Sequence, residues 1–248
     1  MARKIRRRAP AKESLRGKVA LITGASQGIG LAIARALAAQ GCALVITGRN
    51  KPRLQRAGRE LAAQTQVLPV ACDVRDTGAV QSLCGAIEQR FHRLDILVNN
   101  AGIGHSNLNV GKLPLQTWRE VVETNLNGMF LVTHCALPLM RHGSAIVNNL
   151  SIAAKKVFPG SSAYNASKHG ALGFTNTLRE ELRPRGIRVI ALMAGATDTA
   201  IWKTLWPEAP RKKMMSAETV ADALVSALKV PPESTVEELV ILPGSGTL

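Results

Sequence analysis

Short apolar runs alternate with longer amphipathic ones from Lys18 onward. The short runs are typical of buried strands, whereas the longer ones repeat apolar residues at helical spacing. The expected strands are 19–23, 43–47, 67–74, 95–98, 145–150, 187–193 and 239–242. The expected helices are 29–40, 51–64, 77–91, 114–141, 163–183 and 216–229.

Local signals mark several element ends. Gly41 suits the C-terminal cap of helix 29–40, and Ser216 can cap the last helix. Pro138 is expected to bend or end helix 114–141. Strands that alternate with helices predict βαβ crossovers, and therefore an α/β fold with a doubly wound parallel sheet, Rossmann-like and three-layered. Residues 200–215 are expected to form one long irregular loop, a frequent place for an active-site lid.

Length and charge divide the chain into two parts. Residues 17–248 are enough for a single large domain, and residues 1–16 form a basic tail. The formal net charge is +15, and part of it lies in this tail. A disordered, solvated tail is the favoured interpretation, and binding to nucleic acid or an acidic surface stays open as the less favoured one.

Composition also bears on location and metal binding. No apolar run approaches the roughly 20 residues that a membrane-spanning helix needs, and no apolar segment follows the basic N-terminus. These features indicate a cytoplasmic protein without membrane association. The four cysteines form no CxxC pair and no histidine cluster has zinc-ligand spacing, so we expect inert thiols and no metal site.

A glycine-rich loop lies between the first expected strand and the first expected helix. Gly24 permits a tight turn, Gly28 lets the backbone approach a pyrophosphate, and Gly30 lets the helix pack closely on the sheet. The free N–H groups of the helix N-terminus then face the phosphates. The loop also contributes the candidate cofactor-binding residues Ser26, Gln27 and Ile29.

The end of the second strand discriminates between the two nicotinamide cofactors. An acidic residue there would bind the ribose 2′-hydroxyl and repel a 2′-phosphate, but the chain has Gly48-Arg49-Asn50. Arg49 is a bidentate phosphate donor, so we predict NADP(H), with Ser26 as a further donor. Alternatively, Arg49 points into solvent.

Three residues suit proton transfer to a carbonyl oxygen. Tyr164 is the only tyrosine, and Lys168 lies one helical turn later on the same face. A nearby ammonium is expected to lower the pKa of the phenol, so that Tyr164 can exchange a proton with substrate. Ser151 follows a strand end, where open α/β sheets bind ligands, and can hold the same oxygen.

From about Lys18 to its C-terminus the chain resembles the short-chain dehydrogenase/reductase family. The resemblance is carried by Thr23-Gly24-x-x-x-Gly28-x-Gly30, Asn99-Asn100-Ala101-Gly102, Asn125, Ser151 and Tyr164-x-x-x-Lys168, in that order. Two positions depart from the family pattern. Leu150-Ser151 replaces Ser-Ser, and Ala194-Gly195 replaces Pro-Gly after the sixth strand, which is expected to loosen that loop.

The resemblance implies roles for further residues. Lys168 would also hold the nicotinamide ribose, and Asn125 would hold a water that links Lys168 to solvent. Asn99 and its neighbours would support the central sheet and line the adenine-ribose side. The remaining cofactor-binding candidates are Asp73, Val74, Asn100, Ala101, Gly102, Gly195, Thr197 and Thr199. Similar family members suggest a homotetramer or homodimer packed through the two long central helices.

These features predict an NADPH-dependent reductase of ketones or aldehydes. A sharper version is a 3-oxoacyl-acyl-carrier-protein reductase, with Arg141, Arg185 and Arg211-Lys212-Lys213 docking an acidic carrier; solvated basic surface is the alternative. A different class is a catalytically silent NADP(H)-sensing protein. His105 either touches substrate or faces solvent, and Trp202 and Trp206 either cover the substrate or pack ordinarily.

Overall fold

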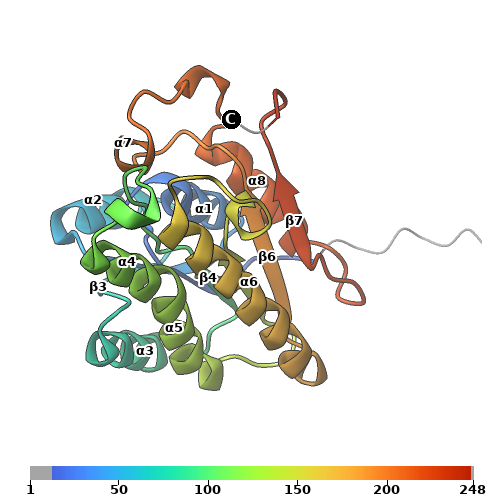
Figure 1. Cartoon of the computed structure of the whole chain (residues 1–248). Coiled ribbons are helices and arrows are strands. Elements are labelled where there is room, and N and C mark those ends of the chain that lie inside the picture. The colour runs from blue at the N-terminus through green and yellow to red at the C-terminus, as the bar shows by residue number, and fades with distance from the viewer. Residues whose placement is uncertain (1–12, 247–248) are drawn as a thin grey trace, which may run out of the picture.

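A seven-stranded parallel sheet forms the centre of the molecule in a computed structural model that describes residues 13–246 (Figure 1). The strand order is β3-β2-β1-β4-β5-β6-β7. The chain crosses to the other side of β1 after β3, which makes the sheet doubly wound, as predicted. The strands are β1 (Val19–Ile22), β2 (Ala43–Gly48), β3 (Val67–Ala71), β4 (Ile96–Asn99), β5 (Ala145–Asn149), β6 (Arg188–Ala194) and β7 (Glu238–Ile241).

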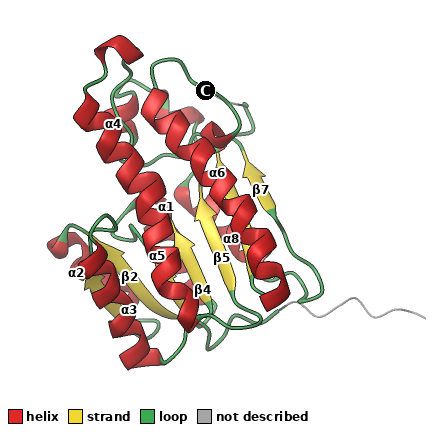
Figure 2. Ribbon diagram, turned by 60° about the horizontal axis from the view of Figure 1, so that its bottom comes forward, coloured by secondary structure: helices red, strands yellow, loops and turns green. Residues whose placement is uncertain are grey.

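Helices cover both faces of the sheet (Figure 2). Two large apolar clusters fill the spaces between the layers, and the inner strands are buried on both sides. One face carries α1 (Gly28–Ala39), α2 (Lys51–Leu61) and α8 (Ala217–Leu228), and the other carries α3 (Thr77–Phe91), α4 (Leu115–Val122), α5 (Gly128–Ala136) and α6 (Ser162–Leu182).

The expected helix 114–141 is divided in the structure. A π-helical turn (Glu123–Asn127) separates α4 from α5, and a 3-10 turn that contains Pro138 follows α5. A mid-helix π turn is a frequent companion of a functional residue, and this one contains Asn125. The segment 200–215 is also less irregular than expected, because it includes the short helix α7 (Trp202–Leu205) and a 3-10 turn (Arg211–Lys213).

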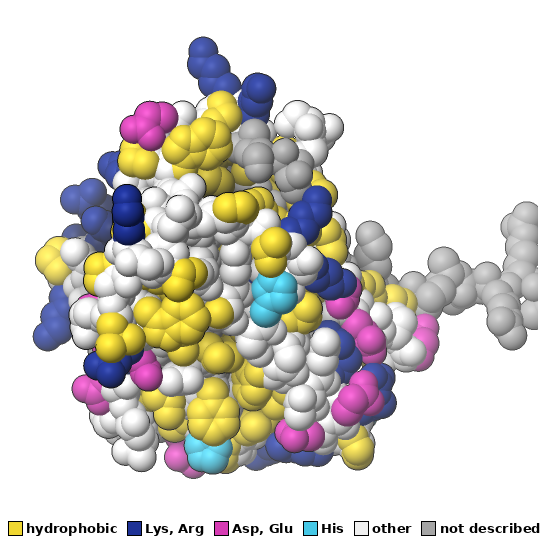
Figure 3. Space-filling model, viewed as in Figure 1, with side chains coloured by type: hydrophobic (Ala, Val, Ile, Leu, Met, Phe, Trp, Pro, Cys, Tyr) yellow, Lys and Arg dark blue, Asp and Glu magenta, His cyan; other side chains and the backbone are white. Residues whose placement is uncertain are grey.

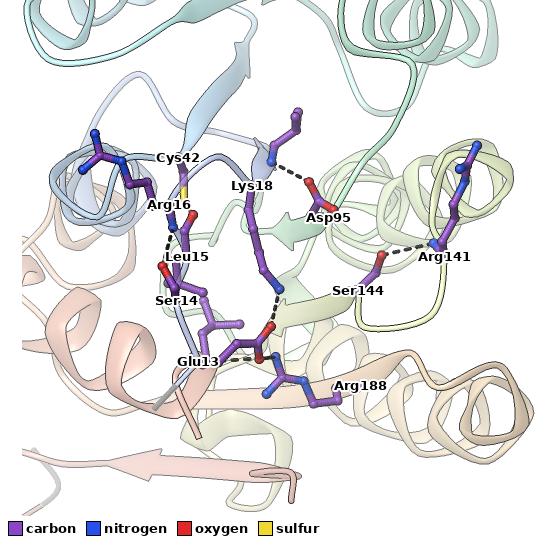
Figure 4. Close-up of polar contacts among 12 residues, drawn as sticks. Glu13, Ser14, Leu15, Arg16, Lys18, Cys42, Asp95, Arg141, Ser144 and Arg188 are labelled. Carbon is purple, nitrogen blue, oxygen red and sulfur yellow. Dashed lines mark hydrogen bonds and ion pairs between the residues drawn. The ribbon is translucent and has the colours of Figure 1, made fainter. Parts of the chain in front are cut away.

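The packed domain begins before residue 17, which corrects the boundary of the predicted tail. Leu15 is only 2% exposed, and its carbonyl oxygen accepts a bond from the Cys42 thiol. Glu13 binds Lys18 and Arg188 at the amino edge of the sheet (Figure 4). The segment 13–16 is therefore part of the domain, and residues 1–12 of the predicted tail lie outside the described residues.

Two further predictions concern composition. The four cysteines are free, and burial raises the pKa of the Cys42 and Cys72 thiols to about 11, so neither is reactive near neutrality. Among residues 13–246, no helix is both long and apolar enough to cross a bilayer.

Candidate active site

A cavity of about 650 Å³ opens at the carboxyl edge of the sheet. It is lined by segments that follow β1 to β6, where ligands of open α/β sheets bind. The predicted site residues that line it are Gly24, Ser26, Gln27, Gly28, Ile29, Arg49, Asp73, Val74, Asn100, Ala101, Gly102, Ser151, Tyr164, Lys168, Gly195, Thr197 and Thr199. Gly30, Asn99 and Asn125 lie behind this lining.

The loop after β1 leaves the N-terminus of α1 free for an anion. Gln27 is the N-cap residue, but its side chain makes no hydrogen bond to the backbone N–H groups of the helix, and no acidic residue lies in the first turn. Gly24 and Gly28 have φ angles of +65° and +57°, which favour glycine. A Cβ at Gly30 would overlap the Asn100 amide and come within 2.6 Å of the Gly24 carbonyl oxygen. The loop therefore has the backbone geometry of a phosphate-binding turn.

The turn after β4 is joined to this loop by Thr23. The Thr23 hydroxyl accepts bonds of 2.9 Å from the backbone N–H groups of Asn100 and Ala101. The Asn100 amide donates to the Thr23 carbonyl oxygen at 2.9 Å. Asn99 is buried and instead donates to Asn148 and Thr133, so it links β4 to β5 and α5. Asn100 thus faces the cavity while Asn99 supports the sheet.

Two arginines lie at the end of the cavity next to β2. Arg49 follows the strand, and Arg53 lies in the first turn of α2, where its guanidinium donates to Gln27 at 2.5 Å. Asp73, after β3, forms a bidentate pair with Arg75, which holds the pKa of that carboxyl below its usual range. This end of the cavity therefore presents two cations near the loop after β1.

Ser151 lies just beyond β5 and starts a 3-10 turn, with its Oγ accepting a bond from Ala153 N at 3.1 Å. Its φ of 136° and ψ of 161° fall in a region that is essentially restricted to glycine. The strained backbone directs the residue into the cavity lining, and its hydroxyl lies within hydrogen-bonding reach of Tyr164.

Tyr164 and Lys168 share one face of α6, with the Lys168 Nζ 5.6 Å from the centre of the tyrosine ring. The Lys168 ammonium donates to the Asn149 carbonyl oxygen at 3.0 Å, and burial lowers its pKa to about 8. Burial raises the pKa of Tyr164 above 10, and only the Ser151 hydroxyl opposes this. Burial thus outweighs any lowering by the neighbouring Lys168, and the net shift of the Tyr164 pKa is opposite to the expected one.

Asn125 is fully buried in the π-helical turn behind Gly102. Its amide accepts from Ile103 N at 2.8 Å and donates to the Ile103 carbonyl oxygen at 2.9 Å and the Ser167 hydroxyl at 3.1 Å. Both amide hydrogens are thereby used, so the side chain fixes the loop after β4 against α6.

The loop after β6 is expected to be loosened by the loss of proline, but backbone bonds hold it in place. Gly195 N donates to Ile241 O at 2.8 Å, and Met215 exchanges bonds with Ala196 and Asp198. The Trp202 indole N–H donates to the Thr197 carbonyl oxygen at 2.8 Å, which fixes α7 at the cavity. Trp202 and Trp206 both line the cavity, as one of the two interpretations of the sequence proposed.

The structure also places the remaining residues for which the sequence allowed two interpretations. His105 is buried rather than facing solvent, and it lies outside the cavity lining. Arg141 and Arg185 precede β5 and β6, at the amino edge of the sheet, whereas residues 211–213 follow β6 at the opposite edge. Arg211 is also engaged by Asp198 and the Thr199 carbonyl oxygen. These basic residues do not form one docking patch.

Several lining and supporting residues had no individual signal in the sequence. Arg53 is four residues after Arg49, and this spacing at a helix start is the one clue that points to it. Asn149 holds Lys168 through its carbonyl oxygen and Asn100 through its amide. Further examples are Ile103, Asn107, Ile152, Phe158, Pro159, Ser161, Ile201 and Leu205, which come from loops and short turns without a motif.

Comparison with known proteins gives a consistent family. Residues 18–210 match the family model described as short chain dehydrogenase. A curated relative, sulfoacetaldehyde reductase 2 of Chromohalobacter salexigens, is 34% identical over 236 residues, which cover 91% of this chain and 94% of the relative.

Solved structures with the same fold carry different cofactors. The 3-ketoacyl-(acyl-carrier-protein) reductase from Brucella melitensis, complexed with NADH, has a TM-score of 0.84 at 31% identity and covers 93% of this chain and 99% of its own. The L-sorbose reductase from Gluconobacter frateurii, complexed with NADPH and L-sorbose, has a TM-score of 0.83 at 30% identity. The match covers 92% of this chain and 96% of the reductase chain.

Proposed function

Because the chain belongs to the short-chain dehydrogenase family, we propose that it is an NADP(H)-dependent carbonyl reductase in which Tyr164 protonates the substrate oxygen. The observation that carries this proposal is one cavity that contains the phosphate-binding loop, two arginines, and the group Ser151, Tyr164 and Lys168. Bound NADPH supplies the hydride in this chemistry.

The residues present fit an NADPH molecule. The uncapped N-terminus of α1 suits the pyrophosphate, and the φ angles of Gly24 and Gly28 open the path to it. Arg49 and Arg53 suit the 2′-phosphate, because a guanidinium binds a phosphate bidentately and no carboxylate follows β2. We therefore favour NADP(H) over NAD(H), although one related structure contains NADH. Lys168 would hold the nicotinamide ribose, and Gly195, Thr197 and Thr199 would face the carboxamide side.

The protonation state of Tyr164 suits it to act as the acid in this reduction. Burial raises the pKa of Tyr164, so the phenol carries its proton near neutrality and can give it to a carbonyl oxygen. The Ser151 hydroxyl would hold that oxygen, and the Lys168 ammonium would favour the phenolate left after transfer. The side chain of Asn125 is engaged by Ile103 and Ser167, so in this proposal any water that it holds is bound by its backbone rather than its amide.

The test is NADPH oxidation against a panel of ketones and aldehydes, with Tyr164→Phe as the variant. We expect the wild type to oxidise NADPH, and Tyr164→Phe to lose at least about 1,000-fold in kcat while still binding NADPH, because only the acidic proton is removed. His169→Ala is the control, since His169 lies on the same helix but outside the cavity lining. Binding of NADPH without turnover of any carbonyl would instead support a silent NADP(H)-sensing protein.

The names of the relatives suggest different substrates, which include sulfoacetaldehyde, L-sorbose and a carrier-bound 3-oxoacyl group. A carrier-bound substrate has weak support from surface charge, because Arg141 and Arg185 lie away from the cavity. Comparing turnover of a carrier-bound 3-oxoacyl substrate with that of small ketones tests this version directly.

The proposal includes self-association and a cytoplasmic location. Phe130 on α5 is 49% exposed and packs against His134 and Phe174, and Figure 3 shows hydrophobic side chains gathered on the face that carries α5 and α6. We expect a dimer or tetramer through this face, which Phe130→Glu should dissociate in sedimentation experiments. The free cysteines suit a reducing compartment.

A further inference from the structure

The cavity has two ends of opposite character. Four of its lining residues are charged, and Arg49, Arg53 and Asp73 all lie after β2 and β3. The fourth is Lys168, whose ammonium is buried and bound to the Asn149 carbonyl oxygen. Among residues 13–246, the other end, formed by the segments after β4, β5 and β6, therefore offers a substrate no free charged side chain. We call this end the substrate chamber.

Apolar side chains from all three segments line the substrate chamber. Ile103 comes from the loop after β4, Ile152 and Phe158 come from the segment after β5, and Trp202, Leu205 and Trp206 come from α7 and its end. Trp206 is 45% exposed, so the wall continues to the rim of the cavity. Apart from Ser151 and Tyr164, the polar uncharged side chains of these segments are Asn100, Asn107, Thr124, Asn149, Ser161, Thr197 and Thr199. Four of them, Asn100, Thr124, Asn149 and Thr197, already donate to oxygen atoms within the protein.

The apolar wall is held in contact with the loops opposite. Leu205 packs on Gly104 so closely that a Cβ there would come within 2.5 Å of its Cδ2. Leu108 N donates to the Gly160 carbonyl oxygen at 2.9 Å, and Asn107 lies against Gly160. The indole of Trp202 is fixed by its bond to Thr197. The chamber is thus a preformed apolar pocket rather than a loose loop region.

Electrostatics then decide which carbonyl compounds this chamber accepts. An anionic group buried without a cation or several hydrogen-bond donors loses its hydration without compensation. A polyhydroxylated substrate meets the same difficulty, because the polar side chains that remain, Asn107, Ser161 and Thr199, are too few to satisfy several hydroxyl groups. A neutral apolar body gains from burial against aromatic and aliphatic walls.

We infer that the substrate of this enzyme is a neutral ketone or aldehyde with an apolar body beside its carbonyl group. This inference rests on the proposed reductase function and deepens it. It separates the chain from relatives named for a sulfonated aldehyde or a sugar, despite 34% and 30% identity to them.

Matched pairs of substrates test the inference with the full-length protein and NADPH. The pairs are 4′-methylacetophenone with 4-acetylbenzoate, 4-methylbenzaldehyde with 4-carboxybenzaldehyde, and a 2-alkanone with an oxoalkanoate of equal length. Within each pair the shape is nearly constant and only the charge changes. We expect kcat/KM to be at least about 30-fold higher for the neutral member, because the carboxylate finds no cation in the chamber.

The outcomes separate the inference from the proposed function. Equal or faster reduction of the anionic members, or turnover confined to sugars and small sulfonated aldehydes, overturns the inference and leaves the reductase intact. Oxidation of NADPH with none of the carbonyl compounds overturns the reductase and the inference together.

A charge introduced at the rim gives a second readout. Trp206→Arg places a cation on the lining, where it can pair with a substrate carboxylate and still reach solvent. We expect the ratio of kcat/KM for 4-acetylbenzoate to that for 4′-methylacetophenone to rise about tenfold. Trp118→Arg is the matched control, because Trp118 is a partly exposed tryptophan outside the cavity lining. An unchanged ratio in Trp206→Arg, or an equal rise in both variants, contradicts the inference.

Discussion

The dinucleotide end of the cavity and the substrate chamber are built in different ways. The first consists of short turns directly after β1, β2 and β3, where glycine conformation and charge leave few choices of residue. The second consists of longer loops after β4, β5 and β6, closed by packing of apolar side chains such as Leu205 on Gly104. In the proposed function, backbone geometry specifies cofactor binding, whereas side-chain volume and the lack of charge among the described lining residues would specify the substrate.

Two glycine substitutions disturb the two ends of the cavity separately, and the one at the dinucleotide end has the largest expected effect on stability and NADPH affinity. In Gly30→Ala the new Cβ meets the Asn100 amide and the Gly24 backbone, which cannot move without opening the phosphate loop. We expect a loss of about 3 kcal/mol in the free energy of unfolding and a large loss of NADPH affinity.

Gly104→Ala is the matched substitution in the substrate chamber. Its Cβ meets only the flexible Leu205 side chain on a short helix, so we expect a loss below about 1 kcal/mol, unchanged NADPH affinity and a higher KM for the carbonyl substrate. Thermal unfolding and NADPH titration measure both variants. Similar losses of NADPH affinity in the two would remove the distinction between the ends.

Substituting each of the two arginines tests whether the dinucleotide end binds the 2′-phosphate of NADPH. We expect Arg49→Ala to lower kcat/KM for NADPH about 30-fold and Arg53→Ala to lower it less, because each removes a charge-assisted bond to the 2′-phosphate. Values for NADH should change less than about threefold. Arg56→Ala, on the exposed side of α2, is the control. Parallel losses with both cofactors would mean that the arginines bind no 2′-phosphate.

Lys168 lies between the two ends, and its burial has a cost that depends on pH. The pKa of this lysine falls from 10.5 to about 8 on folding, so the unfolded chain binds the proton more tightly and the buried ammonium destabilises the fold. This destabilisation is complete below about pH 8 and disappears as the pH rises to 10.5. We expect Lys168→Met to be more stable than the wild type by roughly 1–2 kcal/mol at pH 7, since loss of the Asn149 bond offsets part of the gain.

Denaturant unfolding at pH 7 and pH 10 checks this prediction. The gain from Lys168→Met should shrink toward zero at the higher pH, while reductase activity is lost at both. A gain that grows with pH would show that the lysine is not the buried, destabilised cation that the structure contains.

Ser151 gives the smallest expected effect and probes strain at the chamber entrance. Its φ of 136° suits glycine, so Ser151→Gly should be more stable than Ser151→Ala by about 1 kcal/mol, while both lose activity through loss of the hydroxyl. The comparison between the two variants cancels the lost bond to Ala153. Equal stability measured by chemical denaturation would show that the backbone at this position is unstrained.

The sequence predicts the fold where local and tertiary signals agree. Helix α1 begins and ends within one residue of its expected bounds. Its end is set by Gly41, which adopts a φ of +80° just after the helix. The sequence predicts the end of helix 114–141 near Pro138, but not its division by the π-helical turn, because the bonds that join Asn125 to Ile103 and Ser167 link residues distant in sequence. Leu15 was assigned to the tail because its burial depends on contacts that charge and composition do not encode.

The candidate site shows the same division. Motif residues such as Gly28 and Tyr164 are found from spacing alone, and they do line the cavity. The direction of the Tyr164 pKa shift was wrong because the spacing to Lys168 reveals the neighbouring charge but not the desolvation. Phe158 and Leu205 could not be assigned, because apolar loop residues have no pattern that distinguishes a chamber wall from ordinary packing.

In the proposed enzyme, one cavity holds a nicotinamide cofactor between a charged end and an apolar chamber, with Tyr164 at their boundary. A crystal structure of the full-length protein with NADPH and 4′-methylacetophenone tests it most directly. We expect the 2′-phosphate beside Arg49 and Arg53, the nicotinamide beside Tyr164 and Lys168, and the aromatic ring against Trp202 and Leu205. A nicotinamide bound away from the Tyr164 hydroxyl, or a ketone bound outside the chamber, would contradict it.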